Sequence, residues 1–155
     1  MEKFRLKLGA EAEAIPGFLL WQVSKLWQRH LTLALQDLKL PSTQAVILAN
    51  VIRFSEEGRS ATQAMLSEAA KVDRMTASQS LRSLELKGYV TREASPGDKR
   101  ANRVALTTEG RRVALETVKR LADTHRKFFE PLADETEAVV GYLQRLVQAN
   151  KLALP

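Results

Sequence analysis

Apolar residues recur at helical spacing in several separate stretches of this 155-residue chain. The first stretch, residues 16–39, begins with Pro16, which suits a first helical turn, and carries apolar side chains three or four positions apart. Similar stripes predict four further helices, at about 42–57, 62–70, 108–130 and 132–152. The pattern therefore predicts a mainly α-helical chain.

Another helix is predicted from Asp73 onward by a different kind of stripe. Ala77, Leu81, Leu84 and Gly88 are spaced by four, three and four residues, so they share one helix face. Gly88 is expected to end this helix, because glycine readily adopts the left-handed conformation found at helix ends.

The pattern then changes to two short strand-like runs. Residues 89–93 and 102–106 have the composition of strands, and Ser95-Pro96-Gly97-Asp98 between them has the composition of a tight turn. The predicted order is four helices, a two-stranded ribbon and two more helices.

Short polar residues stand where these helices are expected to begin. Their side-chain oxygens can accept hydrogen bonds from the free backbone N–H groups of a first helical turn. The candidate caps are Ser42 or Thr43, Thr62, Asp73 and Thr107.

The outer face of the helix after Asp73 carries side chains that can reach the base edges and phosphates of DNA. They are Met75, Thr76, Ser78, Gln79, Arg82 and Ser83. Arginine can pair with guanine, and glutamine with adenine, in the major groove. A solvated helix face is the plainer interpretation of such residues, but a helix that leads into a basic ribbon is typical of a winged helix-turn-helix. We therefore expect this face to contact DNA.

Positive charge is concentrated in the same part of the chain. The whole sequence has a net charge of +6, and the segment from Lys71 to Arg103 contains eight basic and four acidic residues. About a fifth of the chain thus holds most of the net charge, as binding to a polyanion requires. Charge alone would fit a solubilising surface equally well.

Other chemistries find little support in the composition. The chain has no cysteine and two histidines that are distant in sequence, so we expect no metal site and no cofactor. No nucleophile–base pair or phosphate-binding loop is apparent, so we do not expect an enzyme. No stretch is apolar for long enough to span a membrane, and the N-terminus lacks the apolar core of a secretory signal. These features predict a soluble cytoplasmic protein.

Three segments, in this order, resemble the MarR-type (multiple-antibiotic-resistance) transcriptional regulators. They are Leu84-Glu85-Leu86-Lys87-Gly88-Tyr89-Val90-Thr91-Arg92, Asp98-Lys99-Arg100-Ala101 and Leu106-Thr107-Thr108-Glu109-Gly110. The family has a similar leucine-to-glycine helix end, an Asp-x-Arg-Ala wing tip and a Leu-Thr-x-x-Gly start to the next helix. The resemblance covers nearly the whole chain.

The resemblance implies a homodimeric winged helix-turn-helix protein that binds a pseudo-palindromic operator. Residues 1–155 would form one domain, with dimerisation helices at 16–39 and 108–152 and a DNA-binding lobe at 42–107. Many members of the family release DNA when they bind a small aromatic or phenolic ligand. The expected function is therefore a homodimeric repressor that is relieved by a small organic ligand.

The resemblance also assigns roles within the wing. Arg100 would enter the minor groove and Asp98 would help to hold it, with Lys99 beside them. A narrow minor groove concentrates negative potential and so attracts arginine without a base-specific bond. Arg92 and Arg103 flank the wing and are expected to contact phosphates, which position a protein on the duplex.

Trp21, Trp27 and His30 in the first helix have two interpretations. They could form the wall of a ligand pocket between the first helix, the second helix and the helix after the wing. Packing in the core or in the dimer is the better supported alternative for tryptophans at helical spacing. For the whole chain, the alternative function is a winged-helix module for protein–protein interaction, which would have no need of the Asp98-Lys99-Arg100 wing tip.

Overall fold

The computed structural model describes residues 15–95 and 98–151, and it describes the side chains of residues 15–93 and 103–151. In chain order its elements are α1 (Pro16–Leu35), the 3-10 helix η2 (Gln36–Leu38), α2 (Ser42–Glu56), β1 (Ala61–Thr62), α3 (Gln63–Ala70), α4 (Arg74–Leu86), β2 (Val90–Ser95), β3 (Asp98–Leu106), α5 (Thr108–Phe129), the 3-10 helix η3 (Glu130–Glu135) and α6 (Thr136–Lys151). The predicted fold class, mainly α with a winged helix-turn-helix, is confirmed.

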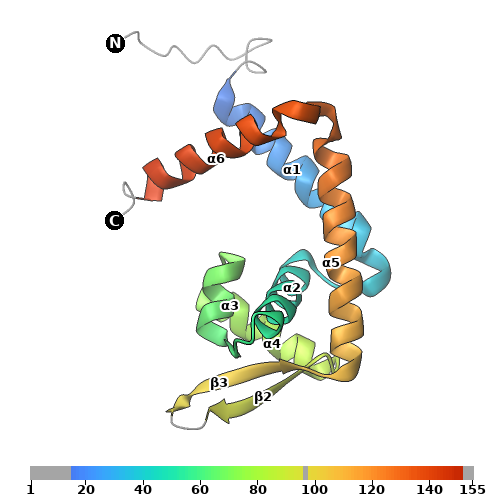
Figure 1. Cartoon of the computed structure of the whole chain (residues 1–155), viewed down its shortest axis with the longest axis vertical. Coiled ribbons are helices and arrows are strands. Elements are labelled where there is room, and N and C mark those ends of the chain that lie inside the picture. Colours follow the sequence, from blue (N-terminus) through green and yellow to red (C-terminus); the bar gives the residue numbers. More distant parts are fainter. Residues whose placement is uncertain (1–14, 96–97, 152–155) are drawn as a thin grey trace.

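The elements form a compact lobe with a long helical extension. Helices α2, α3 and α4 and the sheet lie together at one end of the molecule (Figure 1). Helix α5 runs from this lobe to the other end, where α1 and α6 are found. The elements of the lobe span residues 42–106.

The wing belongs to a three-stranded antiparallel sheet with the order β1-β3-β2. Strands β2 and β3 form the predicted hairpin, with Val90 opposite Leu106 and Arg92 opposite Val104. Strand β1 was not predicted; its Ala61 pairs with Val104. The sheet therefore anchors the base of the wing to the segment that leads into α3.

Three of the predicted helix caps are confirmed. Thr62 accepts a hydrogen bond from the Met65 N–H at 3.3 Å, and Asp73 accepts one from the Thr76 N–H at 2.8 Å. Thr107 caps α5 by a corresponding bond, described below.

The cap predicted at Ser42 or Thr43 is wrong. Pro41 occupies the N-cap position of α2 with no side-chain cap bond, and Ser42 is already helical. Proline fixes its own φ near the observed −56°, so the chain enters α2 without a polar cap.

The start of α5 is clamped to the end of α4. Gly88 has a φ of +70°, as predicted for the residue that ends the helix. The Thr107 hydroxyl donates to the Gly88 carbonyl at 2.6 Å and accepts from the Gly110 N–H at 2.9 Å. A Cβ on Gly110 would lie 1.7 Å from the Tyr89 carbonyl oxygen, so only glycine fits there. The Leu-Thr-x-x-Gly segment is therefore a structural joint.

The helices of the extension differ from the predicted ranges at their ends. Helix α1 stops at Leu35 and passes through η2 to Lys39, which has a left-handed φ of 52°. The region predicted as one pair of helices at 108–152 contains α5, η3 and α6, with a sharp bend at Ala133. Proline at position 131 lacks a backbone N–H, which is consistent with α5 ending just before it.

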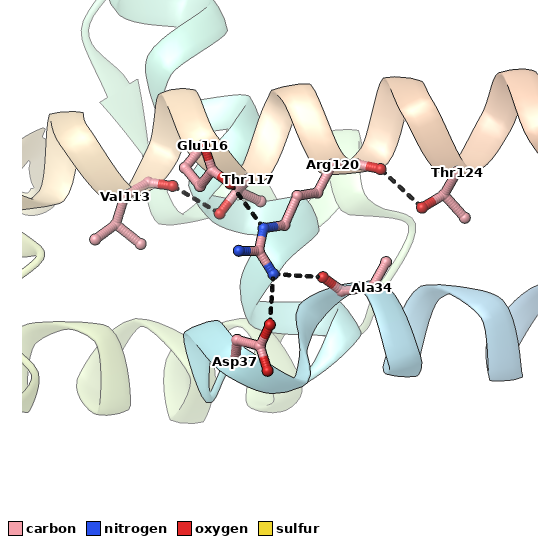
Figure 2. Close-up of polar contacts among 7 residues, drawn as sticks. All are labelled: Ala34, Asp37, Val113, Glu116, Thr117, Arg120 and Thr124. Atoms are coloured by element: carbon pink, nitrogen blue, oxygen red, sulfur yellow. Dashed lines mark hydrogen bonds and ion pairs between the residues drawn. The ribbon is translucent and has the colours of Figure 1, made fainter.

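A polar junction connects α5 to the end of α1 (Figure 2). The Arg120 guanidinium donates to the Ala34 carbonyl at 3.0 Å, to Glu116 at 2.8 Å and to Asp37 at 3.5 Å. It thus satisfies a carbonyl near the C-terminus of α1, which has no partner within its own helix. This contact joins the two helices that lead from the extension to the lobe.

The hydrophobic core lies inside the lobe and continues along the lower parts of α1 and α5. Its largest fully buried side chains are Leu35, Ile47, Leu48, Val51, Leu66, Leu81, Leu84 and Val90. The core fixes α4 on its inner face, so the opposite face of that helix has a defined orientation.

Candidate nucleic-acid interface

Helix α4 presents two distinct faces. Ala77, Leu81 and Leu84 are fully buried, as the spacing predicted, and they pack within the core. Gln79 and Arg82 are exposed on the other side, and Met75 near the helix start is 71% exposed. The arrangement holds two side chains capable of bidentate base contacts, and one apolar side chain, at the surface of a rigid helix.

Other predicted residues of α4 have intramolecular partners. The Thr76 hydroxyl donates to Asp73 at 2.6 Å, which completes the cap and lowers the pKa of the Asp73 carboxyl. The Ser83 hydroxyl accepts from the Gln44 side chain of α2 at 3.1 Å. Ser78 is half-buried. These contacts orient α4 against its neighbours and leave Met75, Gln79 and Arg82 as its most accessible predicted contacts.

Arg92 on β2 holds the wing against α4. Its guanidinium donates from Nε to Glu85 Oε2 at 2.9 Å and from Nη2 to the same oxygen at 2.5 Å. The bond from Arg92 holds the pKa of the Glu85 carboxyl below its usual range. A phosphate contact by Arg92 would have to share this guanidinium with Glu85.

Arg103 on β3 lies on the other face of the sheet. Side chains alternate along a strand, and the neighbouring Val104 is buried against the core. Arg103 is therefore directed away from α4, in a cleft that also includes Arg111 of α5. The side chains of Asp98, Lys99 and Arg100 at the wing tip lie outside the described residues; their backbone begins β3.

Lys87 is a contact that the sequence analysis did not identify. Its ammonium donates to the Lys39 carbonyl at 2.8 Å and to the Gln44 side-chain oxygen at 2.9 Å. Partial burial lowers the pKa of Lys87. With the bond from Gln44 to Ser83, this network fixes the last turn of α4 on the start of α2. No local sequence signal links Lys87 to Lys39, which lies 48 residues earlier.

The three candidate ligand residues do not surround one cavity. Trp27 lines an apolar cavity of about 590 Å³ between α1, α5, η3 and α6, and its ring also packs on Phe128 at 5.2 Å. His30 packs on Phe128 at 5.3 Å, and Trp21 is exposed beside Phe18. Trp21 and His30 are absent from the lining of this cavity.

Within residues 15–95 and 98–151, no group of three or more His, Cys, Asp or Glu side chains is placed to hold a metal ion. Over the same residues, no helix has the length and apolar character needed to cross a membrane.

A helix with an exposed polar face, packed beside a hairpin wing, defines the chain as a winged helix-turn-helix protein. A profile of the MarR family matches residues 38–101. The HTH-type transcriptional regulator YdcH of Bacillus subtilis is 37% identical over 95 residues, which span 61% of this chain and 65% of that protein. The segment that includes α2 to β3 is therefore similar to the MarR family, and the match to YdcH spans less than two thirds of that protein.

Solved structures resemble the chain over most of its length. A mutant of MarR from E. coli, in complex with operator DNA, is 27% identical, with a TM-score of 0.73 over 90% of this chain and 99% of that chain. MepR of S. aureus in its DNA complex is 20% identical, with a TM-score of 0.79 over 87% and 98%, which supports the fold alone. Both structures contain DNA bound to the relative.

Proposed function

We propose that the protein is a sequence-specific DNA-binding transcriptional regulator that acts as a homodimeric repressor on a pseudo-palindromic operator. The observation that carries the proposal is the exposed face of α4, where Gln79 and Arg82 stand opposite a fully buried stripe. Such a helix can lie in the major groove with its outer side chains on base edges. Binding to chromosomal DNA would also account for the cytoplasmic location expected from the sequence.

The homodimer is proposed from the apolar surface at the far end of the extension. Large side chains of α1 and α6 are exposed there in the single chain: Phe18, Leu19, Leu20, Trp21, Val23, Leu26, Val140, Tyr142, Leu143, Leu146 and Val147. Exposed apolar patches of this kind mark interaction sites, and a closed dimer buries the same patch on both copies. A dimer would also present two α4 helices to the two halves of an operator.

Within the proposal, the contacts divide by groove. Met75, Gln79 and Arg82 would contact bases in the major groove, with Thr76, Ser78 and Ser83 at the edges of that contact. Arg100, held by Asp98 beside Lys99, would enter the minor groove. Arg92 would contact a phosphate while its guanidinium remains paired with Glu85.

Relief by a small organic ligand is part of the same proposal. Trp27 lines an apolar cavity, whereas Trp21 and His30 pack elsewhere. The cavity is continuous with the apolar surface assigned to the dimer, which favours packing as the role of these three residues.

One observation favours the alternative of a protein–protein interaction module. Leu86, at the end of α4, is 85% exposed and has no role in the proposed DNA contact. Salt dependence separates the two functions, because lysine and arginine contacts to phosphate release counterions from DNA. A regulator with several phosphate contacts per subunit should lose roughly a thousandfold in affinity between about 50 and 200 mM salt. A flat response would favour the interaction module.

The decisive test compares Arg82→Ala with Arg100→Ala on operator variants that differ by single bases. The operator is first selected from genomic fragments with the purified protein. Arg82→Ala should relax the preference at one position in each half-site, at a cost of about 1–3 kcal/mol. Arg100→Ala should weaken binding broadly, with residual preference following A·T-rich flanks.

Arg126→Ala is the matched control, because Arg126 lies near the end of α5 and pairs with Asp123 on its own helix. It should bind the operator like the unmodified protein. The proposal fails if Arg82→Ala leaves the base preference at every operator position unchanged. It also fails if Arg100→Ala binds the operator with unchanged affinity.

A further inference from the structure

A cleft of about 880 Å³ lies at the base of the wing. Its walls come from the end of α2, from β1 and β3, and from the first turns of α5. The loop between α2 and β1, strand β3 and helix α5 contribute arginines, which are Arg59, Arg103, Arg111 and Arg112. The cleft is distinct from the apolar cavity beside Trp27 and from the outer face of α4.

The arginine of the wing strand is directed away from the proposed DNA surface. Val104 is buried on the core side of β3 and pairs with Arg92, which bonds to Glu85 of α4. Arg103 is the next residue along the strand and so lies on the opposite face. An occupant held by Arg103 would leave the outer face of α4 uncovered.

The cleft has more positive charge than its surroundings neutralise. Arg59 pairs with Glu57 at 3.0 Å, and Arg112 pairs with Glu109 at 2.7 Å. Across the described part of the chain, Arg103 and Arg111 have no ion-pair partner within 4 Å. Glu93, the cross-strand neighbour of Arg103, brings one carboxylate to a lining that has four guanidinium groups.

Apolar and hydroxyl groups complete the lining. Leu115 on α5 is 50% exposed within the cleft, next to the buried Val51 of α2. Ser55, Ser60 and Thr108 add hydroxyl groups. Guanidinium groups bind carboxylate and phosphate oxygens with two parallel hydrogen bonds, and an adjacent apolar surface favours a ligand with a hydrophobic body.

We propose that this cleft binds a small organic oxyanion, a carboxylate or a phosphate ester on an apolar body, with Arg103 and Arg111 on the anionic group and Leu115 on the body. The ligand would contact the wing strand and the start of α5 together, so it would stabilise one arrangement of these two elements. The inference deepens the ligand response of the proposed function and rests on that function only for its effect on DNA.

The test measures binding of benzoate, phenyl phosphate and the neutral benzyl alcohol to the full chain by calorimetry and methyl NMR. Benzoate or phenyl phosphate should bind saturably and shift the methyl signals of Val51 and Leu115. Benzyl alcohol should bind at least about tenfold more weakly, because charge-assisted bonds to arginine are lost. Preference for benzoate identifies a carboxylate ligand, and preference for phenyl phosphate identifies a phosphate ester.

Arginine variants locate the site. Arg103→Gln and Arg111→Gln, singly and together, should weaken anion binding, with a loss of about tenfold or more for the double variant. Arg126→Gln is the control that removes the same charge elsewhere on α5. Thermal melts of each variant establish that the fold is retained, and the single variants serve if the double variant unfolds.

Three results would overturn the inference. They are equal anion binding by the double variant, methyl shifts that exclude Val51 and Leu115, and inorganic phosphate binding as tightly as phenyl phosphate. Operator binding is measured on the same preparations. A protein that binds its operator and neither anion refutes this inference alone, whereas one that binds the anions but no DNA refutes the proposed function alone.

Discussion

The two ends of this molecule are packed in opposite ways. Among the residues that the structure describes, every buried hydrophobic side chain lies between Leu31 and Ala114, whereas α6 has no buried residue. At the end formed by α1 and α6, large side chains such as Leu20, Tyr142 and Leu146 are more than half exposed. The lobe therefore has a complete core within one chain, and the helical end needs a second surface to bury its apolar side chains.

Deletion of residues 132–155, which removes α6, should have the largest effect. The truncated chain should lose its dimer and bind a two-half-site operator about a hundredfold to ten-thousandfold more weakly, because the second half-site contact is no longer intramolecular. Light scattering gives the oligomeric state and fluorescence anisotropy gives the affinity. A truncated chain that is still a full-affinity dimer would show that α6 is not the interface.

Gly110→Ala should damage the lobe, because its Cβ would overlap the Tyr89 carbonyl. Two backbone segments must then move apart, and we expect a loss of about 3 kcal/mol in the free energy of unfolding. Chemical denaturation measures the change. The matched variant is Gly141→Ala on α6, where a Cβ meets nothing within 4 Å in the single chain.

Gly141→Ala should be neutral or stabilise the chain by up to about 1 kcal/mol through helix propensity. Equal destabilisation by the two alanines would mean that the start of α5 tolerates movement, and the joint at Gly88, Thr107 and Gly110 would lose its structural role.

Arg120→Leu should loosen the connection between the two ends. The variant removes the bonds to the Ala34 carbonyl and to Asp37, so amide hydrogen exchange should accelerate in η2 and the melting temperature should fall by a few degrees. Arg126→Leu removes an ion pair within α5 only and should leave exchange in η2 unchanged. Unchanged exchange in both variants would contradict the junction.

Asp73→Ala should have the smallest effect, a modest loss of lobe stability that depends on pH. Hydrogen bonds from Thr76 lower the pKa of Asp73 from its ordinary value of 3.8. The folded state thus favours the charged carboxylate, so its stabilisation is fully present above this ordinary value and is lost as the pH falls through the lowered folded value. Melting temperatures of both proteins at pH 7 and in strong acid should therefore converge at low pH. A constant difference would argue against the cap.

Local signals in the sequence predicted much of the lobe. The caps at Thr62, Asp73 and Thr107 depend on a side chain and the next helical turn, so a short stretch of sequence contains all the information. Gly88 likewise ends α4 where its left-handed conformation was expected. The buried stripe of Ala77, Leu81 and Leu84 followed from helical spacing alone.

Features that depend on distant segments were not predictable. Strand β1 has two residues, too few to show an alternating pattern, and it forms because β3 is its neighbour. The bond from Arg92 to Glu85 depends on how β2 folds back on α4, and Lys87 finds Lys39 only through the packing of α4 on α2. The arginine cleft joins α2, β3 and α5 in the same way.

The joint between α4 and α5 has a consequence for the span of DNA that a dimer can cover. Helix α5 has 22 residues, so its length is about 33 Å at about 1.5 Å per residue. Because Thr107 fixes the first turn of α5 to Gly88, a change in the tilt of α5 moves the wing and α4 together. A tilt of about 5° where the two copies meet moves the lobe by about 3 Å, which is close to the rise of about 3.4 Å per base pair along the duplex axis. A small change in the angle between the two copies would thus change the half-site spacing that the dimer fits by about one base pair.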